Sequence, residues 1–218
     1  MRQLALLFFL VADAFSQTSQ VPYAPNSDGP GPTFTSENVR LSYEGTYSSI
    51  RKVDFRNLRS PIFGDDGKPA GSISFKNGRH KSNDPSDHYL ARLDSVYYLG
   101  SLSNGNSALV LYSWSDGGVS SSQGATAQVF TVSDGHLRSV QKIDWDTHFQ
   151  AGQPTDSFDR STNTLVIRSA HYIPGDAHCC VSAMDSVTFR WDGTRFVQSG
   201  IQTELSEYGK REGKTLPR

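Results

Sequence analysis

Both cysteines of the chain and two of its six histidines lie within the ten-residue segment HYIPGDAHCC, residues 171–180. If the end of this segment is extended, alternate side chains share a face, so Asp176, His178 and Cys180 point one way. These three side chains offer oxygen, nitrogen and sulfur donors, which suit zinc or copper. The spacing therefore predicts a metal site at Asp176, His178 and Cys180, to which His171 can add a further nitrogen.

The adjacent cysteines, Cys179 and Cys180, allow a different chemistry. Consecutive Cα atoms are about 3.8 Å apart, which is shorter than the roughly 4.4–6.8 Å of an ordinary disulfide. A bond between the two cysteines would close a strained, easily reduced ring that stiffens the turn. A vicinal disulfide is the favoured interpretation; two buried thiols, or pairing with another chain, are the alternatives.

Support for catalysis is weak. Neither Gly-x-Ser-x-Gly nor His-Glu-x-x-His occurs in the sequence. Asp144, Asp146 and His148 can be interpreted as an acid–base group, but the two aspartates share a strand face opposite the intervening tryptophan, which is typical of a solvent-facing side. His80 and His88 flank a polar stretch that we interpret as a solvated loop rather than a cation site. An enzyme is therefore the less favoured interpretation, and we assign no catalytic residue and no cofactor.

The N-terminus has the pattern of an export signal. Arg2 precedes the apolar run Leu4–Val11, and an A-x-A-like cleavage site follows at residues 12–14. The run is shorter than the ~20 residues of a membrane span, and no cysteine follows it for lipid attachment. We therefore expect a signal peptide over residues 1–14, and a secreted or periplasmic protein with neither a membrane span nor a lipid anchor.

The composition is that of a globular domain, with 36% hydrophobic, 20% charged and 11% aromatic residues. The 21 basic residues nearly balance the 22 acidic ones, and no basic run is present. Nucleic-acid binding draws largely on clustered Lys and Arg, so the sequence argues against a nucleic-acid partner. Two cysteines are too few for a disulfide scaffold, so the fold must depend on its apolar core.

The elements that position these side chains are expected to be strands. Apolar and polar residues alternate along much of the chain, which is typical of half-buried strands. Turn signals lie between them at Asn77-Gly78, Asp134-Gly135 and Asp192-Gly193. The run Ala108–Trp114 is apolar on both faces and predicts a central strand. The predicted fold class is mainly β, an antiparallel meander forming a barrel or a sandwich. The clearest alternating positions are Val39, Leu41 and Tyr43; Val53 and Phe55; Ile73 and Phe75; and Val187, Phe189 and Trp191.

The domain organisation follows from composition. Residues 15–36 are rich in Pro, Ser and Gly and predict a flexible linker. Residues 37–206 are expected to form one β-rich domain, and the polar residues 207–218 are expected to be a mobile tail. One short helix is predicted from Asp84, as its cap, to Leu93, so the domain has at most one or two short helices.

Short motifs follow one another in order along the C-terminal half: Gly100–Gly105, Asp116–Gly118, Val129–Thr131, Asp134-Gly135, Thr164–Ile167, His178–Cys180 and Phe189–Phe196. In order and spacing, residues from about 94 to 198 resemble a bacterial family of uncharacterised exported proteins that includes lipoproteins of the LppP/LprE type. The resemblance implies an exported β-rich domain and brings no activity. A calcium-binding turn of the relatives has Ser101 and Asn104 at its acidic positions here, so the resemblance does not imply a calcium site.

These observations favour an exported, non-catalytic β-rich domain that binds another protein or a polymer at the cell envelope or exterior. The first alternative is a metal-binding protein or metal-dependent enzyme that uses Asp176, His178 and Cys180. The second is a secreted inhibitor that presents the 171–180 loop to its target. The sequence does not specify the partner.

Overall fold

The structure is a computed structural model of the 218-residue chain and describes residues 33–41, 45–63, 69–81, 89–100, 105–116, 123–146, 155–176 and 180–216. Antiparallel strands make up most of this part of the chain. The elements in chain order are β1 (Thr33–Arg40), the 3-10 helices η1 (Ile50–Lys52) and η2 (Phe55–Asn57), β2 (Arg59–Phe63), β3 (Pro69–Ser74), β4 (Arg79–Lys81), β5 (Tyr89–Leu99), β6 (Ser107–Asp116), β7 (Gln123–Ser133), β8 (His136–Asp146), β9 (Asp156–Asp159), β10 (Thr164–His171), β11 (Ala183–Trp191), β12 (Phe196–Leu205) and the helix α1 (Glu207–Arg211).

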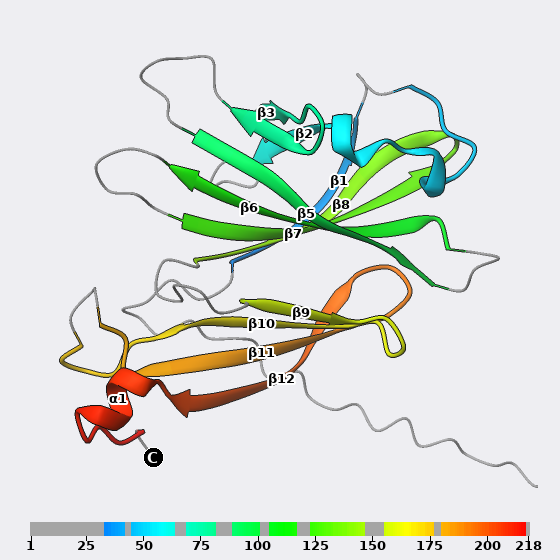
Figure 1. Cartoon of the computed structure of the whole chain (residues 1–218). Coiled ribbons are helices and arrows are strands. Elements are labelled where there is room, and N and C mark those ends of the chain that lie inside the picture. Colours follow the sequence, from blue (N-terminus) through cyan, green and yellow to red (C-terminus); the bar gives the residue numbers. More distant parts are fainter. Residues whose placement is uncertain are drawn as a thin grey trace, which may run out of the picture.

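The strands form a layered sandwich (Figure 1). A six-stranded sheet has the order β1-β8-β7-β6-β5-β4, and a four-stranded sheet has the order β12-β11-β10-β9. The β2–β3 hairpin and the two 3-10 helices lie over the other face of the six-stranded sheet. Both large sheets are open, with edge strands at each side, so the predicted mainly-β fold is confirmed in its sandwich form.

The six-stranded sheet is the middle layer, and β6 shows why. Ala108, Val110 and Tyr112 of β6 join a buried cluster with residues of η1, η2 and β3 on one face. Leu109 and Leu111, the residues between them, join a second buried cluster with residues of the four-stranded sheet. Alternate residues of a strand point to opposite faces, so a strand covered on both sides must be apolar throughout. The prediction of a central strand in this run is confirmed.

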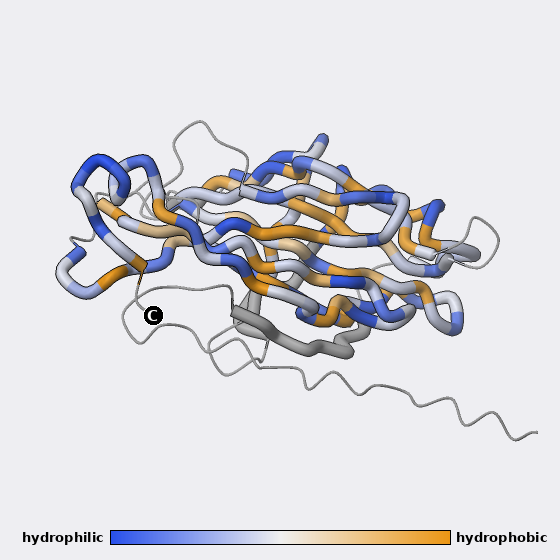
Figure 2. The backbone as a smooth tube through the Cα atoms, turned by 90° about the horizontal axis from the view of Figure 1, so that it is seen from below, coloured by the Kyte–Doolittle hydropathy of each residue, from blue (hydrophilic) through white to orange (hydrophobic). Residues whose placement is uncertain are grey.

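Hydropathy follows the same layering (Figure 2). Apolar stretches lie along the strands, and the turns that join them are mostly hydrophilic. The predicted turns are confirmed where they can be tested by backbone geometry. Asn77 and Gly78 have φ of 54° and 77°, and Asp134 and Gly135 have φ of 53° and 76°. These left-handed pairs suit two-residue hairpin turns.

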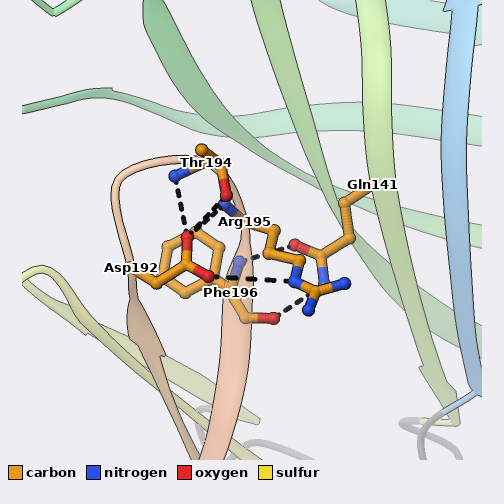
Figure 3. A network of polar contacts seen from close by, with 5 residues as sticks. All are labelled: Gln141, Asp192, Thr194, Arg195 and Phe196. Carbon is orange, nitrogen blue, oxygen red and sulfur yellow. Dashed lines mark hydrogen bonds and ion pairs between the residues drawn. The ribbon is translucent and has the colours of Figure 1, made fainter.

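One hydrogen-bonded clamp joins the two large sheets (Figure 3). Gln141 of β8 donates through Nε2 to the Phe196 carbonyl at 2.8 Å, and its Oε1 accepts from the Phe196 N–H at 2.7 Å. The adjacent turn is fixed by Asp192, whose Oδ1 accepts from the Thr194 and Arg195 N–H groups at 2.8 and 2.9 Å. Gln141 therefore acts as an added strand partner for the first residue of β12.

Two local predictions were wrong. The alternation of Val53 and Phe55 predicted a strand, but this region forms η1 and η2. Asp54 accepts hydrogen bonds from the Arg56 N–H at 3.1 Å and from Asn57 Nδ2 at 2.7 Å, and these bonds stabilise the tight turn of η2. Both apolar side chains are still buried, because a turn can direct two nearby residues into one core.

The helix predicted from Asp84 to Leu93 is wrong from residue 89 onward, where the chain forms β5. β5 pairs with β6 along its whole length, from Tyr89 opposite Asp116 to Leu99 opposite Ser107. A two-turn helix is marginal by itself, and the ladder to a central strand stabilises the extended form. Residues 82–88 lie outside the described part of the chain.

The ends of the domain also differ from the expected boundaries. β1 begins at Thr33, inside the predicted linker, and pairs with β8. Residues from Glu207, expected to be a mobile tail, begin with α1, where Ser206 caps the helix by accepting from the Gly209 N–H at 3.0 Å. A Cβ on Gly209 would overlap the Ser182 carbonyl, so only glycine permits α1 to pack this closely. Within the described ranges, no helix is both long and apolar enough to cross a membrane.

Candidate functional site

Asp176, the first predicted metal ligand, holds its own loop together. Its Oδ2 accepts from the N–H groups of Ile173 and Ser182, each at 2.9 Å, and its Oδ1 accepts from the Ser182 hydroxyl. Lys214, beyond α1, places its Nζ 3.6 Å from the same Oδ1, and the Asp176 side chain is only 1% exposed. The carboxylate therefore closes the loop between β10 and β11 and ties the C-terminal segment to it.

The charge of Asp176 is stabilised by these contacts. Burial acts to raise the pKa of this carboxyl, but the hydrogen bonds from Ser182 and Ile173, together with the Lys214 ammonium, outweigh it and lower the pKa below its ordinary value. A carboxylate with both oxygens occupied in this way has little capacity left for a metal ion.

His171 is held by a second carboxylate. Its Nδ1 lies 3.0 and 3.1 Å from the two oxygens of Asp185, whose side chain is 5% exposed, and the Thr203 hydroxyl donates to Asp185 at 2.6 Å. Ser169, Asp185 and Thr203 are paired across β10, β11 and β12, and Ser169 Oγ is buried with no hydrogen-bond partner among the described residues. Histidines that bind metals or act as general bases are often oriented in this way, by a buried carboxylate that binds Nδ1.

The remaining residues of the predicted metal site and the predicted disulfide are only partly covered. Cys180 is half-buried, whereas His178 and Cys179 lie outside the described residues. Within the described residues, no group of three or more His, Cys, Asp or Glu side chains is placed to hold a metal ion. The metal site at Asp176, His178 and Cys180 and the Cys179–Cys180 bond stay predictions.

The other predicted groups have structural contacts. Asp144 accepts from the Thr126 hydroxyl at 2.5 Å and lies 2.9 Å from Lys142 Nζ, while Trp145 is buried. His80 Nδ1 lies 3.0 Å from the Ser74 carbonyl oxygen. His88 and His148 lie outside the described residues, so the interpretations of a solvated loop between His80 and His88 and of an acid–base group with His148 stay untested.

A different feature has the geometry of a binding surface. An open hollow of about 540 Å³ lies at the corner of the six-stranded sheet, where β4 to β7 run side by side. Three exposed cations, Arg79, Lys81 and Arg92, line it together with Leu90, whose residue surface is 44% exposed. We call this set the basic hollow. Its other lining residues are His80, Ala91, Ser113, Trp114, Ser115, Gln123 and Gly124.

Strand register places the cations on one side of the sheet. Arg79 of β4 is directly opposite Arg92 of β5, and Lys81 is opposite Leu90. Alternate residues share a face, so all three cations point the same way. Like charges directly opposite each other are unfavourable unless a negative charge lies between them.

The positive charge of the hollow is only partly neutralised by the chain itself. Arg92 Nε lies 2.9 Å from Asp94 Oδ1. Within the described residues, no carboxylate pairs with Arg79 or Lys81. The charge of Asp94 also acts on the facing sheet. Burial raises the pKa of Asp156 in β9, and the nearby charge of Asp94 raises it further. The hollow therefore presents net positive charge beside an apolar side chain.

Trp114 of β6 packs against β7 at this corner of the sheet. Its indole ring lies across Gly124 of β7, and a Cβ at that position would overlap the ring. Trp114 is opposite Ala91 of β5 and packs against the buried cluster that contains Ala91, so the glycine makes room for the ring on the face opposite the three cations.

Sequence reasoning missed the basic hollow. Arg79 and Lys81 are separated by one residue, a spacing that places both on one face of a strand, and this was the available signal. Arg92 could be added only once β4 was known to pair with β5.

Comparisons of the chain with protein-family models, with curated proteins and with solved structures found no match. The resemblance of residues 94–198 to exported LppP/LprE-type proteins therefore stays a prediction.

Proposed function

We propose that this chain is a non-catalytic binding domain of the cell envelope or exterior, and that its basic hollow takes an acidic segment of a protein or polymer partner. The observation that carries the proposal is the pair Arg79 and Lys81, two exposed cations on one strand face with no carboxylate partner in the described residues. Export comes from the N-terminal sequence pattern.

The spacing of the two cations defines the ligand further. Side chains two residues apart on a strand are about 6.6–6.8 Å apart. In an extended acidic peptide, side chains two residues apart lie on one face at the same interval, so two alternate carboxylates can face Arg79 and Lys81 together. Leu90 adds an apolar contact directly opposite Lys81.

Binding of carboxylate polymers tests the proposal. Poly-L-glutamate and polygalacturonate carry the same charged group on a peptide and on a glycan backbone, and neutral dextran lacks it. We expect the two acidic polymers to bind in isothermal titration calorimetry and dextran not to bind, because only the acidic polymers carry charges that complement Arg79, Lys81 and Arg92. The affinity should fall as salt is raised from 20 to 300 mM, since exposed charges are screened.

The double variant Arg79→Gln/Lys81→Gln should bind about tenfold more weakly at low salt, as two surface ion pairs contribute up to roughly 1 kcal/mol each. The matched control is Lys210→Gln/Arg211→Gln, which removes the same charge from exposed positions on α1. Equal binding by both double variants, or no binding of either acidic polymer by the wild type, would refute the proposal. A preference for one polymer distinguishes a protein from a glycan partner.

A metal-binding role is the second candidate, and one contact favours it. The Asp185 carboxylate fixes the Nδ1 side of His171, which is how a metal-ligating histidine is commonly oriented. Elemental analysis of protein purified without added metal separates the two functions. Zinc or copper at one equivalent, lost in His171→Ala, would favour this candidate. The inhibitor hypothesis for the 171–180 loop has no comparable contact in its support.

A further inference from the structure

β12 presents an unpaired backbone edge. It pairs with β11 on one side, and the Ser206 N–H donates to the Ser182 carbonyl at 2.9 Å. In an antiparallel pair, every second residue of a strand exchanges backbone hydrogen bonds with the strand beside it. The Ser206 bond shows that Ser206, Glu204 and Gln202 are the residues that bond to β11. Ile201, Thr203 and Leu205 therefore direct their N–H and C=O groups away from β11. Within the described residues, these backbone groups have no partner.

The first part of β12 differs, because its edge is already occupied. Phe196 has both its N–H and its C=O bonded to the Gln141 side chain. A bulge then interrupts the register between Thr188 and Phe189 of β11, opposite Gly200 and Gln198. The regular, open edge is therefore residues 201–205.

This open edge lacks the usual protection against pairing. Natural edge strands carry Lys, Pro, or inward-pointing charges that prevent another strand from adding. Residues 201–205 read IQTEL, and their single charge, Glu204, is paired with Arg168 at 2.7 Å. Ile201 is 50% exposed, an apolar surface directly at the edge.

We propose that a second copy of this chain pairs with this edge, β12 against β12, around a two-fold axis through Thr203. The edge is self-complementary in that register. Thr203 faces its own copy, and Ile201 faces Leu205 of the other protomer, so apolar side chains meet on one face. On the other face Gln202 lies opposite Glu204, so no like charges are juxtaposed. About six backbone hydrogen bonds form across the axis, and the two four-stranded sheets become one continuous sheet.

The helix after β12 leaves this edge accessible. The chain turns away at Ser206, and Gly209 packs against the Ser182 carbonyl. Lys214 then reaches Asp176 on the loop that precedes β11. These contacts draw α1 toward the β11 side of the sheet, while β12 is the outermost strand (Figure 1).

Sedimentation equilibrium of the protein between 1 and 200 µM tests the proposal. We expect a reversible monomer–dimer equilibrium, weakened about tenfold or more in Ile201→Lys, which replaces both Ile–Leu contacts of the dimer by a charge. Gln202→Lys is the matched control, because the new lysine points to the other face, toward Glu204 of the second protomer, and should not weaken the dimer. Circular dichroism of both variants checks that each is folded.

A disulfide cross-link between protomers tests the proposed register of the β12–β12 pair. Residues of a hydrogen-bonded antiparallel pair have Cα atoms about 5.5 Å apart, within the range of a disulfide. Thr203→Cys should therefore form a 203–203 disulfide between protomers with oxidised glutathione, which is reduced as the thiols are oxidised. Gln202→Cys should not, because its copies are diagonal neighbours about 7–8 Å apart. Peptide mapping distinguishes this bond from one that involves Cys179 or Cys180.

Three results would overturn the proposal. The protein could stay monomeric throughout the concentration range. It could form a dimer that Ile201→Lys leaves intact. Lastly, the amide hydrogens of Ile201, Thr203 and Leu205 could be protected from exchange equally in the monomer, which would place another segment of the same chain on the edge.

Discussion

Replacing Gln141 by alanine is expected to lower the free energy of unfolding by about 2–4 kcal/mol. The change removes two hydrogen bonds between the two large sheets and leaves both apolar clusters intact. Gln141 is 5% exposed and Phe196 is 3% exposed, so water has little access to the groups they share. The two hydrogen bonds between them, of 2.7 and 2.8 Å, join residues 55 positions apart in the sequence.

The magnitude follows from what the substitution leaves behind. The alanine variant leaves a buried N–H and a buried C=O on Phe196 with no partner, and each such group costs about 1–3 kcal/mol. Water entering the space of the lost side chain recovers part of this cost. With a urea dependence of about 1–3 kcal/mol per molar, the unfolding midpoint should fall by roughly 1–2 M.

Urea titration followed by tryptophan fluorescence and by circular dichroism measures this change. Gln202→Ala on the outer part of β12 is the control, since Gln202 is exposed and should change stability by less than about 0.5 kcal/mol. An alanine variant within 1 kcal/mol of the wild type, with an unchanged urea dependence, would show that the Gln141 clamp does not join the sheets.

Gln141→Glu gives a pH-dependent version of the same test. A neutral carboxylic acid can donate to the Phe196 carbonyl and accept from its N–H, whereas a carboxylate can only accept. Burial beside a carbonyl should therefore raise the folded-state pKa of the new glutamate above its unfolded value of about 4.3. The variant should approach wild-type stability below that value and lose stability as the pH rises through the folded pKa. A deficit that stays constant with pH would contradict this account.

The remaining predictions concern two aspartates. Asp176→Asn should cost about 1–3 kcal/mol at pH 7, because the amide cannot accept the hydrogen bonds of both oxygens. The pKa of Asp176 is lowered in the folded state, so its contribution is present above the unfolded pKa of about 3.9 and is lost as the pH falls through the folded pKa; urea titrations at pH 7 and pH 3 should show the difference shrinking. Asp156→Asn should instead stabilise the protein at pH 7 by less than about 1 kcal/mol, because burial and Asp94 raise the pKa of Asp156 and penalise its charged form. That gain should disappear below pH 3.5, where the wild-type carboxyl is protonated in both states, and a variant less stable than wild type at pH 7 would contradict it.

Local sequence determined most of the secondary structure and the fold class. Turn residues such as Asp134-Gly135 predict a hairpin because few residues adopt the left-handed backbone that the turn needs. The run Ala108–Trp114 predicts a central strand because a strand buried on both faces is apolar at successive positions, whereas a half-buried strand alternates. Both features depend on neighbours in sequence, so the sequence alone was sufficient to identify them.

Tertiary structure decided what each polar side chain does. Asp176 had the spacing of a metal ligand, but its oxygens accept hydrogen bonds within its own loop, because a buried carboxylate must be satisfied by whatever N–H groups the fold brings near it. The sequence predicted a short helix from Asp84 to Leu93, and from Tyr89 onward the neighbouring strands selected an extended strand by pairing with its backbone.

The segment 171–180 attracted the first interpretation because its donors are close in sequence, whereas the basic hollow and the Gln141 clamp join residues that are distant in it. Arg79 and Arg92 are thirteen positions apart and become direct neighbours only through the register of β4 and β5. Strand register is set by the burial of whole faces and not by any one side chain. The sequence therefore determined which strands form, and only the packed sheets decided which charges meet on them.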